Sequence, residues 1–297
     1  MLGQEMKALA IILARAGSKG LPRKNMLPVG PQVLCAGRRI RPPCAFWTLR
    51  HAIDSHAVGA IALSTDDDEL KTLAQDMDRA GELKPQRAAA QVSGPMGGVG
   101  ESKRLWIVDR PAELAGDRAT IDAAARHAVN QLEHDLPELR NPRAPIAILY
   151  ANVPVRPPDL TDRALAELAN DRPGRPPADS VQSYLGVGKH HPWWTARIDP
   201  DSAGVSPWEG NTLNHGVFRR QDLPPAFVPD GGVIAVTREA LMLEISAGVS
   251  PGPHAFFGRD DRRRGVVSAD HADAVVDIDT HIDLLVADAL LKERAGA

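Results

Sequence analysis

A short apolar run that ends in a glycine-rich, basic segment constrains this chain more than any other feature. Residues 8–14 are all Ala, Ile or Leu, which is typical of a strand buried on both faces in a parallel sheet. The run stops at Arg15, and Gly17 and Gly20 follow, two residues that allow a tight turn and a close approach of backbone N–H groups to a ligand. Ligands bind at the carboxyl ends of strands in open α/β sheets, so this segment predicts a site for an anionic group, most suitably a polyphosphate.

The charges of the segment support an anion site but do not identify a known motif. Arg15, Lys19, Arg23 and Lys24 place positive charge close to the end of the expected strand. The spacing is neither that of a Walker A loop nor that of the dinucleotide-binding glycine pattern. A basic surface turn is the structural alternative, and we interpret Arg23 as a solvated charge.

Strand and helix patterns alternate over the first half of the chain, which predicts a doubly wound, mostly parallel α/β sheet. Acidic residues 66–69 follow the second strand, and we expect most of them to cap the next helix, because carboxylates favour a helix N-terminus. Residues 80–100 are poor in large apolar side chains and are expected to form a surface loop. The expected strands are 58–65, 147–152 and 232–236, and the expected helices are 45–53, 120–132, 161–168 and 282–293.

The pattern changes between residues 179 and 227, where bulky aromatics concentrate. Trp193, Trp194 and Trp208 lie in this stretch, and residues 190–198 resemble a strand. We expect an excursion from the sheet that buries its aromatics against something else, with a partner subunit as one candidate. His190, His191 and His215 lack the spacing of a zinc site, so packing or solvated roles are expected for them.

Composition narrows the function classes. The chain has 297 residues, of which 43% are hydrophobic and 25% charged, and its net charge of −3 gives no reason to expect a nucleic-acid or membrane partner. Two cysteines do not form a disulfide framework, so a reducing cytoplasm is the expected compartment. We expect neither a secretory signal nor a membrane-spanning helix.

Six separated stretches, in order along the chain, resemble the acylneuraminate cytidylyltransferase family. They are residues 14–25, Leu63-Ser64-Thr65-Asp66-Asp67, Arg110-Pro111-Ala112-Glu113-Leu114-Ala115, His191-Pro192-Trp193-Trp194, Arg219-Arg220-Gln221-Asp222-Leu223-Pro224-Pro225 and Val276-Asp277-Ile278-Asp279-Thr280. The resemblance implies a Rossmann-like nucleotide-diphospho-sugar transferase fold, a mostly parallel mixed sheet flanked by helices. It implies one domain over residues 1–297, a dimerisation excursion at 179–227 and a homodimer. It also implies Mg²⁺-dependent transfer of CMP from CTP to the anomeric hydroxyl of a sialic-acid-like 2-keto sugar acid, with release of pyrophosphate.

The resemblance also implies roles for individual residues. Arg15, Lys19 and Asp279 match the catalytic positions. Arg110 matches a residue near the cytosine, and an ion pair with Glu113 is its structural alternative. The positions that match the CTP site are Ala14, Arg15, Gly17, Ser18, Lys19, Lys24, Asn25 and Arg110.

Asp277 and Asp279 match the metal positions of the family. Carboxylates suit Mg²⁺, a hard ion that also takes substrate phosphates as ligands. Two residues apart on a regular strand they would point to opposite faces, so both reach one cation only if the segment bends. The structural alternative is a cap by Asp279 or Thr280 on the last helix.

The acceptor side departs from the family. Asn152, Arg156 and Gln221 are the expected acceptor contacts, and a structural salt bridge is the alternative for Arg156. Where the family has Gln-Pro-Thr-Ser-Pro-Leu-Arg, this chain has residues 150–156 with Tyr150 and Val153 among them. Two other hypotheses therefore stay open: an acceptor such as the eight-carbon sugar of lipopolysaccharide (3-deoxy-manno-octulosonate), and a non-catalytic nucleotide-binding relative.

Overall fold

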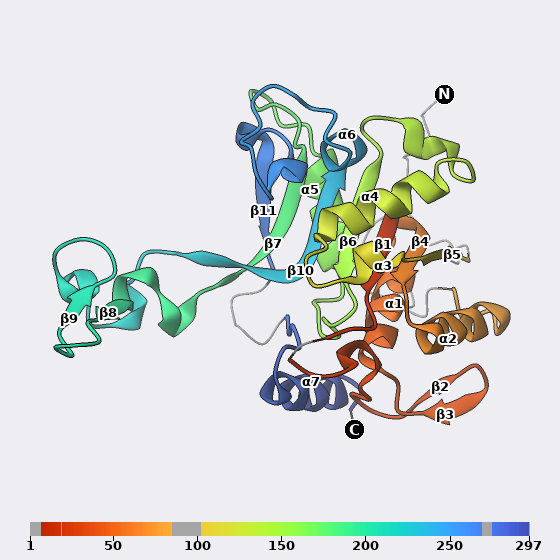
Figure 1. Ribbon diagram of the computed structural model, residues 1–297, viewed down its shortest axis with the longest axis horizontal. Helices are drawn as coiled ribbons and strands as arrows, with labels where there is room; N and C mark the ends of the chain where they lie inside the picture. Colours follow the sequence, from red (N-terminus) through yellow and green to blue (C-terminus); the bar gives the residue numbers. More distant parts are fainter. Residues whose placement is uncertain (1–6, 19, 85–101, 269–274, 297) are drawn as a thin grey trace.

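The main sheet confirms the predicted mostly parallel α/β architecture. The computed structural model describes residues 7–18, 20–84, 102–268 and 275–296, and within them this sheet has seven strands in the order β11-β7-β10-β6-β1-β4-β5 (Figure 1). Strands β6, β1, β4 and β5 are parallel, whereas β10 runs antiparallel to both β6 and β7. The strands are β1 (Ala8–Ala14), β4 (Val58–Thr65), β5 (Arg104–Asp109), β6 (Pro145–Tyr150), β7 (Ser180–Gly186), β10 (Phe227–Thr237) and β11 (Arg263–Val267).

Helices cover both faces of the sheet, because β1 offers apolar side chains to each. All seven residues of β1 are buried; Ala8, Ala10 and Ile12 pack into one core cluster and Leu9, Ile11 and Leu13 into another. The first cluster includes α1 (Cys44–Asp54), α2 (Asp68–Arg79) and α5 (Leu160–Ala169); the second includes α4 (Ile121–Leu132) and α6 (Arg238–Leu241). None of the helices in the described ranges is long and apolar enough to cross a membrane.

The last helix, α7 (His281–Arg294), lies beyond the carboxyl ends of the parallel strands and holds the segment that follows β1 (Figure 1). Its Asp288 carboxylate accepts hydrogen bonds from Gly30 N and Arg41 Nη2, both at 2.7 Å. Gly30 has φ of +81°, and a Cβ there would meet the Leu291 side chain at 3.0 Å. The stretch before α1 also contains a small hairpin of β2 (Val33–Cys35) and β3 (Arg38–Ile40).

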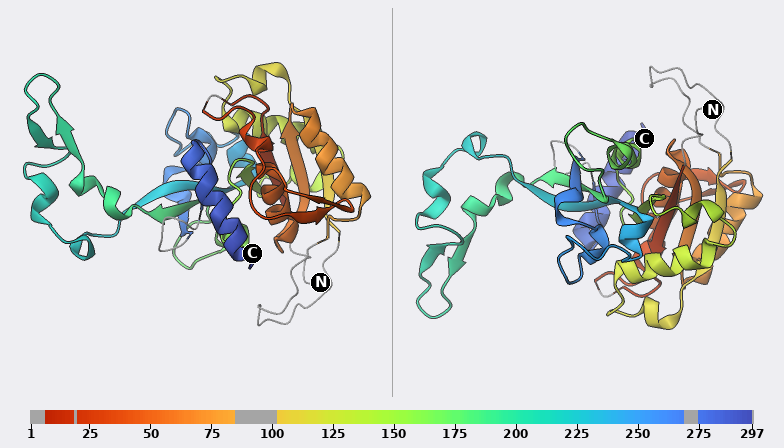
Figure 2. Two further views of the ribbon diagram at one scale, coloured as in Figure 1. Left: turned by 90° about the horizontal axis from the view of Figure 1, so that it is seen from below. Right: turned by 90° about the horizontal axis from the view of Figure 1, so that it is seen from above.

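Residues 187–226, here called the arm, extend away from the body between β7 and β10 (Figures 1 and 2). The strand-like run expected at 190–198 is wrong for most of its length: 3₁₀ turns occupy Gly188–His190 and Pro192–Trp194, and only β8 (Ala196–Ile198), paired with β9 (Val205–Pro207), is extended. Pro192 begins one of these turns and His191 caps it. The Trp193 ring stacks on His215 with centroids 4.6 Å apart, a packing role.

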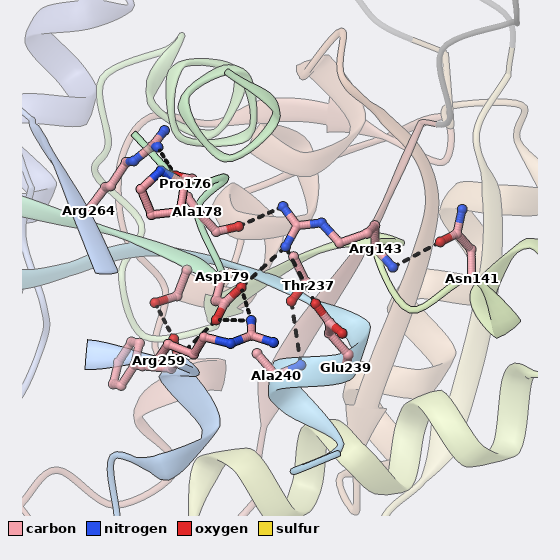
Figure 3. Close-up of polar contacts among 12 residues, drawn as sticks. Asn141, Arg143, Pro176, Ala178, Asp179, Thr237, Glu239, Ala240, Arg259 and Arg264 are labelled. Atoms are coloured by element: carbon pink, nitrogen blue, oxygen red, sulfur yellow. Dashed lines mark hydrogen bonds and ion pairs between the residues drawn. The ribbon is translucent and has the colours of Figure 1, made fainter. Parts of the chain in front are cut away.

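A buried carboxylate fixes the opposite edge of the sheet, where β7 begins and β10 ends (Figure 3). Asp179 is fully buried and pairs with Arg143 at 3.2 Å and with Arg259 at 2.8 Å. The Arg259 backbone N–H donates to the same carboxylate at 3.0 Å. These contacts tie the segment after α6 to the sheet.

Candidate functional site

Two carboxylates and one amide set the path of the loop that follows β1. Asp66, directly after β4, accepts a hydrogen bond from Ala16 N at 2.7 Å. Asn25, which is buried, donates from Nδ2 to Arg15 O at 2.9 Å and so closes the loop on itself. Arg15 Nη1 contacts Asp117 Oδ1 at 2.9 Å, and Asp117 lies between α3 (Ala112–Ala115) and α4. The backbone of the loop is therefore fixed while its N–H groups and cations remain at the edge of the sheet.

The acids after β4 divide into two roles. Asp67 caps α2, accepting from Glu69 N at 3.0 Å and Leu70 N at 3.3 Å, which confirms the expected capping role. Asp66 instead holds the loop, a role that sequence reasoning missed. Arg23 has φ of +52° and pairs with Glu69 at 3.0 Å.

The loop meets the two-aspartate segment directly. Lys24 Nζ lies 2.8 Å from Asp279 Oδ1, and a Cβ at Gly20 would meet the Asp279 carbonyl oxygen at 2.7 Å, so only glycine fits there without a shift. The Asp279 side chain is 71% exposed and so stays accessible from solvent. Residues more than 250 positions apart in sequence thus form one site.

The segment 276–280 is not a regular strand. Ile278 is fully buried, Asp277 contacts Asn152 on one side, and Asp279 contacts Lys24 on the other. Thr280 caps α7 in a capping box with Asp283. Of the two capping candidates, Thr280 therefore caps α7. The Asp279 carboxylate does not cap the helix and remains exposed at the candidate site.

Burial raises the pKa of Asp277 to about 6, and the charge of Asp279 adds to the rise, while Lys24 and Arg156 oppose it. A carboxylate held close to a second one is stabilised by a cation. Gly231, in the bulge of β10 at φ of +72°, supplies room: a Cβ there would lie 3.5 Å from Asp277 Oδ2. In the part of the chain that the structure describes, no group of three or more His, Cys, Asp or Glu could hold a metal by itself. A metal ion at these two aspartates would need further ligands from water or phosphate, as Mg²⁺ commonly takes.

Arg110 closes the β4 side of the site. Its Nη2 donates to Ser64 O at 2.9 Å and its Nε to Ser64 Oγ at 3.2 Å, and its backbone N–H donates to Thr65 O at 3.0 Å. Burial lowers the pKa of Arg110 to about 10, and the nearby Asp66 charge opposes that change. These contacts bind Arg110 to β4, where sequence reasoning had proposed Glu113 as its structural partner.

Arg156 is placed differently from the acceptor contact that we expected. Its side chain is 3% exposed, and its guanidinium donates to Gly232 O at 2.6 Å, Thr48 Oγ1 at 2.9 Å and Tyr150 O at 2.8 Å, and also to Val153 O. Burial lowers the pKa of Arg156 to about 9. This geometry favours a structural role, although with backbone carbonyls in place of the salt bridge that we had considered.

Most of the other predicted positions gather at the carboxyl ends of β1, β4 and β6. Gln221 does not: it is exposed on the arm, in the 3₁₀ turn Arg220–Asp222. Lys19 lies outside the described residues, as does most of the stretch 80–100. Those at the carboxyl-end edge are Ala14, Arg15, Gly17, Ser18, Lys24, Asn25, Arg110, Asn152, Asp277 and Asp279.

Sequence reasoning missed Thr48, whose hydroxyl lies 3.1 to 3.4 Å from the carbonyl oxygens of residues 150, 151 and 153. It also missed Asp117 and Asp66. The available sequence signal for these two acids was their position. Asp66 directly follows β4, and Asp117 lies between α3 and α4.

Comparisons with known proteins bear on this site. A family model described as cytidylyltransferase matches residues 9–82, which span the loop, α1 and α2. An N-acylneuraminate cytidylyltransferase of Streptococcus agalactiae serotype III is 26% identical over 247 residues, 81% of this chain and 46% of that protein. The chain is a distant homologue of the cytidylyltransferases. The resemblance inferred from the six stretches is confirmed at this level.

Other matches are shorter or show the fold alone. An Oncorhynchus mykiss N-acylneuraminate cytidylyltransferase is 37% identical over 73 residues, 25% of this chain and 15% of its own length. The chain thus spans less than half the length of these curated relatives. A solved CMP:2-keto-3-deoxy-manno-octonic acid synthetase complexed with CTP has a TM-score of 0.54 at 15% identity, covering 97% of this chain and 99% of that one. A 4-diphosphocytidyl-2C-methyl-D-erythritol synthase of Anaerococcus prevotii has a TM-score of 0.52 at 13% identity, covering 96% of each chain.

Proposed function

We propose that this protein transfers CMP from CTP to the anomeric hydroxyl of a sialic-acid-like 2-keto sugar acid and releases pyrophosphate. The observation that carries the proposal is the Lys24–Asp279 contact of 2.8 Å, which joins the loop after β1 to the two-aspartate segment before α7. In this proposal Lys24 would bind phosphate, and the neighbouring Asp279 carboxylate would hold the metal ion of a metal-bound triphosphate. The distant homology to N-acylneuraminate cytidylyltransferases supports CTP as the nucleotide.

The reaction is a substitution at the α-phosphorus of CTP. The acceptor oxygen forms a bond to phosphorus, the bond to the pyrophosphate oxygen breaks, and the hydroxyl proton leaves. Catalysis of such a step depends on positioning and on neutralising charge. We assign the triphosphate to Arg15, Lys19 and Lys24 together with the N–H groups at Gly17 and Ser18.

We place the nucleoside between Ala14, Asn25 and Arg110. Arg110 is anchored on Ser64 at the end of β4, and Asn25 closes the loop through Arg15 O. A guanidinium fixed in this way lies at the edge of the site where the base would bind. Asp277 and Asp279 would hold Mg²⁺, which neutralises triphosphate charge and polarises the reacting phosphate when bound.

The acceptor is assigned to the β6 side of the site, beside Asn152. Gln221 can contribute only from a second copy or after movement of the arm, because it is exposed on a segment that extends away from the body (Figure 1). We therefore propose a homodimer in which the arms meet the partner subunit. Arg156 acts in this proposal by holding the turn after β6.

The test is pyrophosphate release with CTP, Mg²⁺ and a panel of 2-keto sugar acids of eight and nine carbons. Release with a nine-carbon acid supports the proposal, and release with 3-deoxy-manno-octulosonate alone supports the second acceptor hypothesis. CTP binding by calorimetry without release across the panel would favour a non-catalytic nucleotide-binding relative.

A further inference from the structure

Asn152 binds the two-aspartate segment through both its backbone and its side chain. Its carbonyl oxygen accepts from Ile278 N at 2.9 Å. Its side-chain Nδ2 donates to Asp277 Oδ1 and lies 3.4 Å from Ile278 O. One residue of the turn after β6 thus fixes the backbone next to Asp277 and the orientation of its carboxylate.

The turn that carries Asn152 is itself held firmly. Arg156 donates to the carbonyl oxygens of residues 150 and 153 on either side of Asn152, and the Thr48 hydroxyl lies against the same turn. An isolated bridge between Val155 and Val276 continues the pairing beyond Asn152. The amide of Asn152 is therefore presented to Asp277 from a fixed backbone.

The two oxygens of the Asp277 carboxylate have different surroundings. Oδ1 accepts the Asn152 amide, whereas Oδ2 faces the bulge of β10 at Gly231, where the missing side chain leaves room. The Tyr150 ring borders the same space, since a Cβ at Gly231 would lie 3.5 Å from its Cδ2 atom. The Asn152 amide therefore competes with a cation for Oδ1 but not for Oδ2.

We propose that Asn152 is a positioning residue that restricts Asp277 to one-oxygen coordination and makes the metal site select Mg²⁺ over Ca²⁺. Mg²⁺ demands octahedral geometry with short bonds and keeps several waters, whereas Ca²⁺ accepts carboxylates through both oxygens. An amide that occupies one oxygen disfavours the two-oxygen mode. The inference rests on the proposed function only in that Asp277 and Asp279 hold the metal.

The experiment measures Mn²⁺ binding to the purified protein by the electron paramagnetic resonance signal of free Mn²⁺, with Mg²⁺ and Ca²⁺ as competitors. For Asn152→Ala we expect the ratio of Ca²⁺ to Mg²⁺ affinity to rise about tenfold, within the range by which groups that orient metal ligands change affinity. Asn152→Thr keeps a donor and should restore part of the selectivity. Asn170→Ala is the matched control, because Asn170 donates to the Glu167 carboxylate at 3.3 Å at the end of α5, away from the site.

The outcomes separate this inference from the proposed function. If the wild-type protein binds Mn²⁺ and Asn152→Ala keeps the wild-type Ca²⁺ to Mg²⁺ ratio, the role of Asn152 is wrong and the transferase proposal stands. Wild-type protein that binds no Mn²⁺ would overturn the metal site and this inference together, and pyrophosphate release on the same sample would then report on the transferase proposal. Should Asn152→Ala fail to fold, Asn152→Leu, which keeps the size and loses the donor without adding a charge or a metal ligand, supplies the same comparison.

Discussion

Near the start of α7, Asp279 and Asp283 lie only four residues apart but have different contacts. Asp279 contacts Lys24 across the site, whereas Asp283 accepts from Thr280 N at 2.7 Å within the capping box. Local hydrogen bonds to the helix start hold the pKa of Asp283 below its usual range, even though partial burial acts in the opposite direction. The same residue type thus forms an ion pair across the candidate site at one position and caps a helix at the other.

Neutralising Asp279 tests this division. We expect Asp279→Asn to raise the Mg²⁺ concentration needed for half-maximal pyrophosphate release by about tenfold or more, which corresponds to about 1.4 kcal/mol of lost binding. Asp283→Asn is the control: it should lower the free energy of unfolding by about 0.5–1 kcal/mol through a weakened cap and leave the Mg²⁺ requirement unchanged. An unaltered Mg²⁺ titration for Asp279→Asn would remove this residue from the metal site.

The buried Arg156 holds backbone carbonyls and acts as a scaffold residue in our proposal, and its replacement distinguishes this role from that of a ligand. Arg156→Lys cannot supply the forked donors that now reach four separate oxygens. We expect the free energy of unfolding to fall by about 2–4 kcal/mol, since buried carbonyls lose their partners. Urea denaturation measures this change. A variant of wild-type stability with a raised KM for the sugar alone would instead restore the ligand role.

Among the elements, β5 is directly preceded by a buried cation, Lys103. Lys103 is 7% exposed and donates from Nζ to Ser55 O at 2.7 Å and to Val58 O. Burial lowers its pKa to about 8. Between this value and the usual lysine pKa of about 10.4, the unfolded chain binds more protons than the folded one, so this group makes stability rise with pH.

We therefore expect the free energy of unfolding of the wild type, relative to Lys103→Met, to increase between pH 8 and about pH 10.4 and to stay level below pH 8. Taking the difference in free energy of unfolding between the two proteins removes the contributions of tyrosines and other lysines that titrate in the same pH range. Denaturation by urea at a series of pH values measures it. A flat difference across the range would show that Lys103 keeps its usual pKa.

The elements themselves were largely predictable, because each depends on local patterns. The apolar run 8–14 and the strand 58–65 match β1 and β4, and the acids after β4 cap α2 as expected. Contacts between distant elements were not predictable in the same way. Two examples are the hydrogen bond from Ala16 N to Asp66 and the contact of Thr48 with the turn after β6. Both depend on how the sheet brings the ends of different strands together, and nothing in the local sequence specifies the partner.

The candidate site divides along the same line. The loop after β1 and the pair Asp277 and Asp279 could be proposed as site residues from the sequence, because their residue types and spacing resemble those of a family. Arg156 has the same sequence signal as a ligand, a cation past the end of a strand, and only its burial against backbone carbonyls reveals the scaffold role. Its exposure could not be deduced without the fold.

At the scale of the whole molecule, the arm exposes several large apolar side chains. Phe218 is 84% exposed, Ile198 71%, Val205 57% and Trp208 54%. The arm extends away from the body in every view (Figures 1 and 2), and the exposure of these side chains shows that they pack little on the rest of the described residues. In the proposed homodimer a second copy would bury this surface, which would also bring Gln221 to a partner site.

We expect the protein to sediment as a dimer at micromolar concentration and Phe218→Asp to weaken the dimer by at least about 100-fold. Full burial of a phenylalanine contributes about 1.5–3 kcal/mol, and a twofold-symmetric interface contains two copies. Leu34→Asp is the matched control, because Leu34 is 68% exposed on the β2–β3 hairpin, outside the arm. The monomeric variant should still bind CTP by calorimetry, since the nucleotide residues lie in the body, but should lose sugar-dependent pyrophosphate release. A wild-type protein that is monomeric and fully active would show instead that the arm serves neither the dimer nor the acceptor.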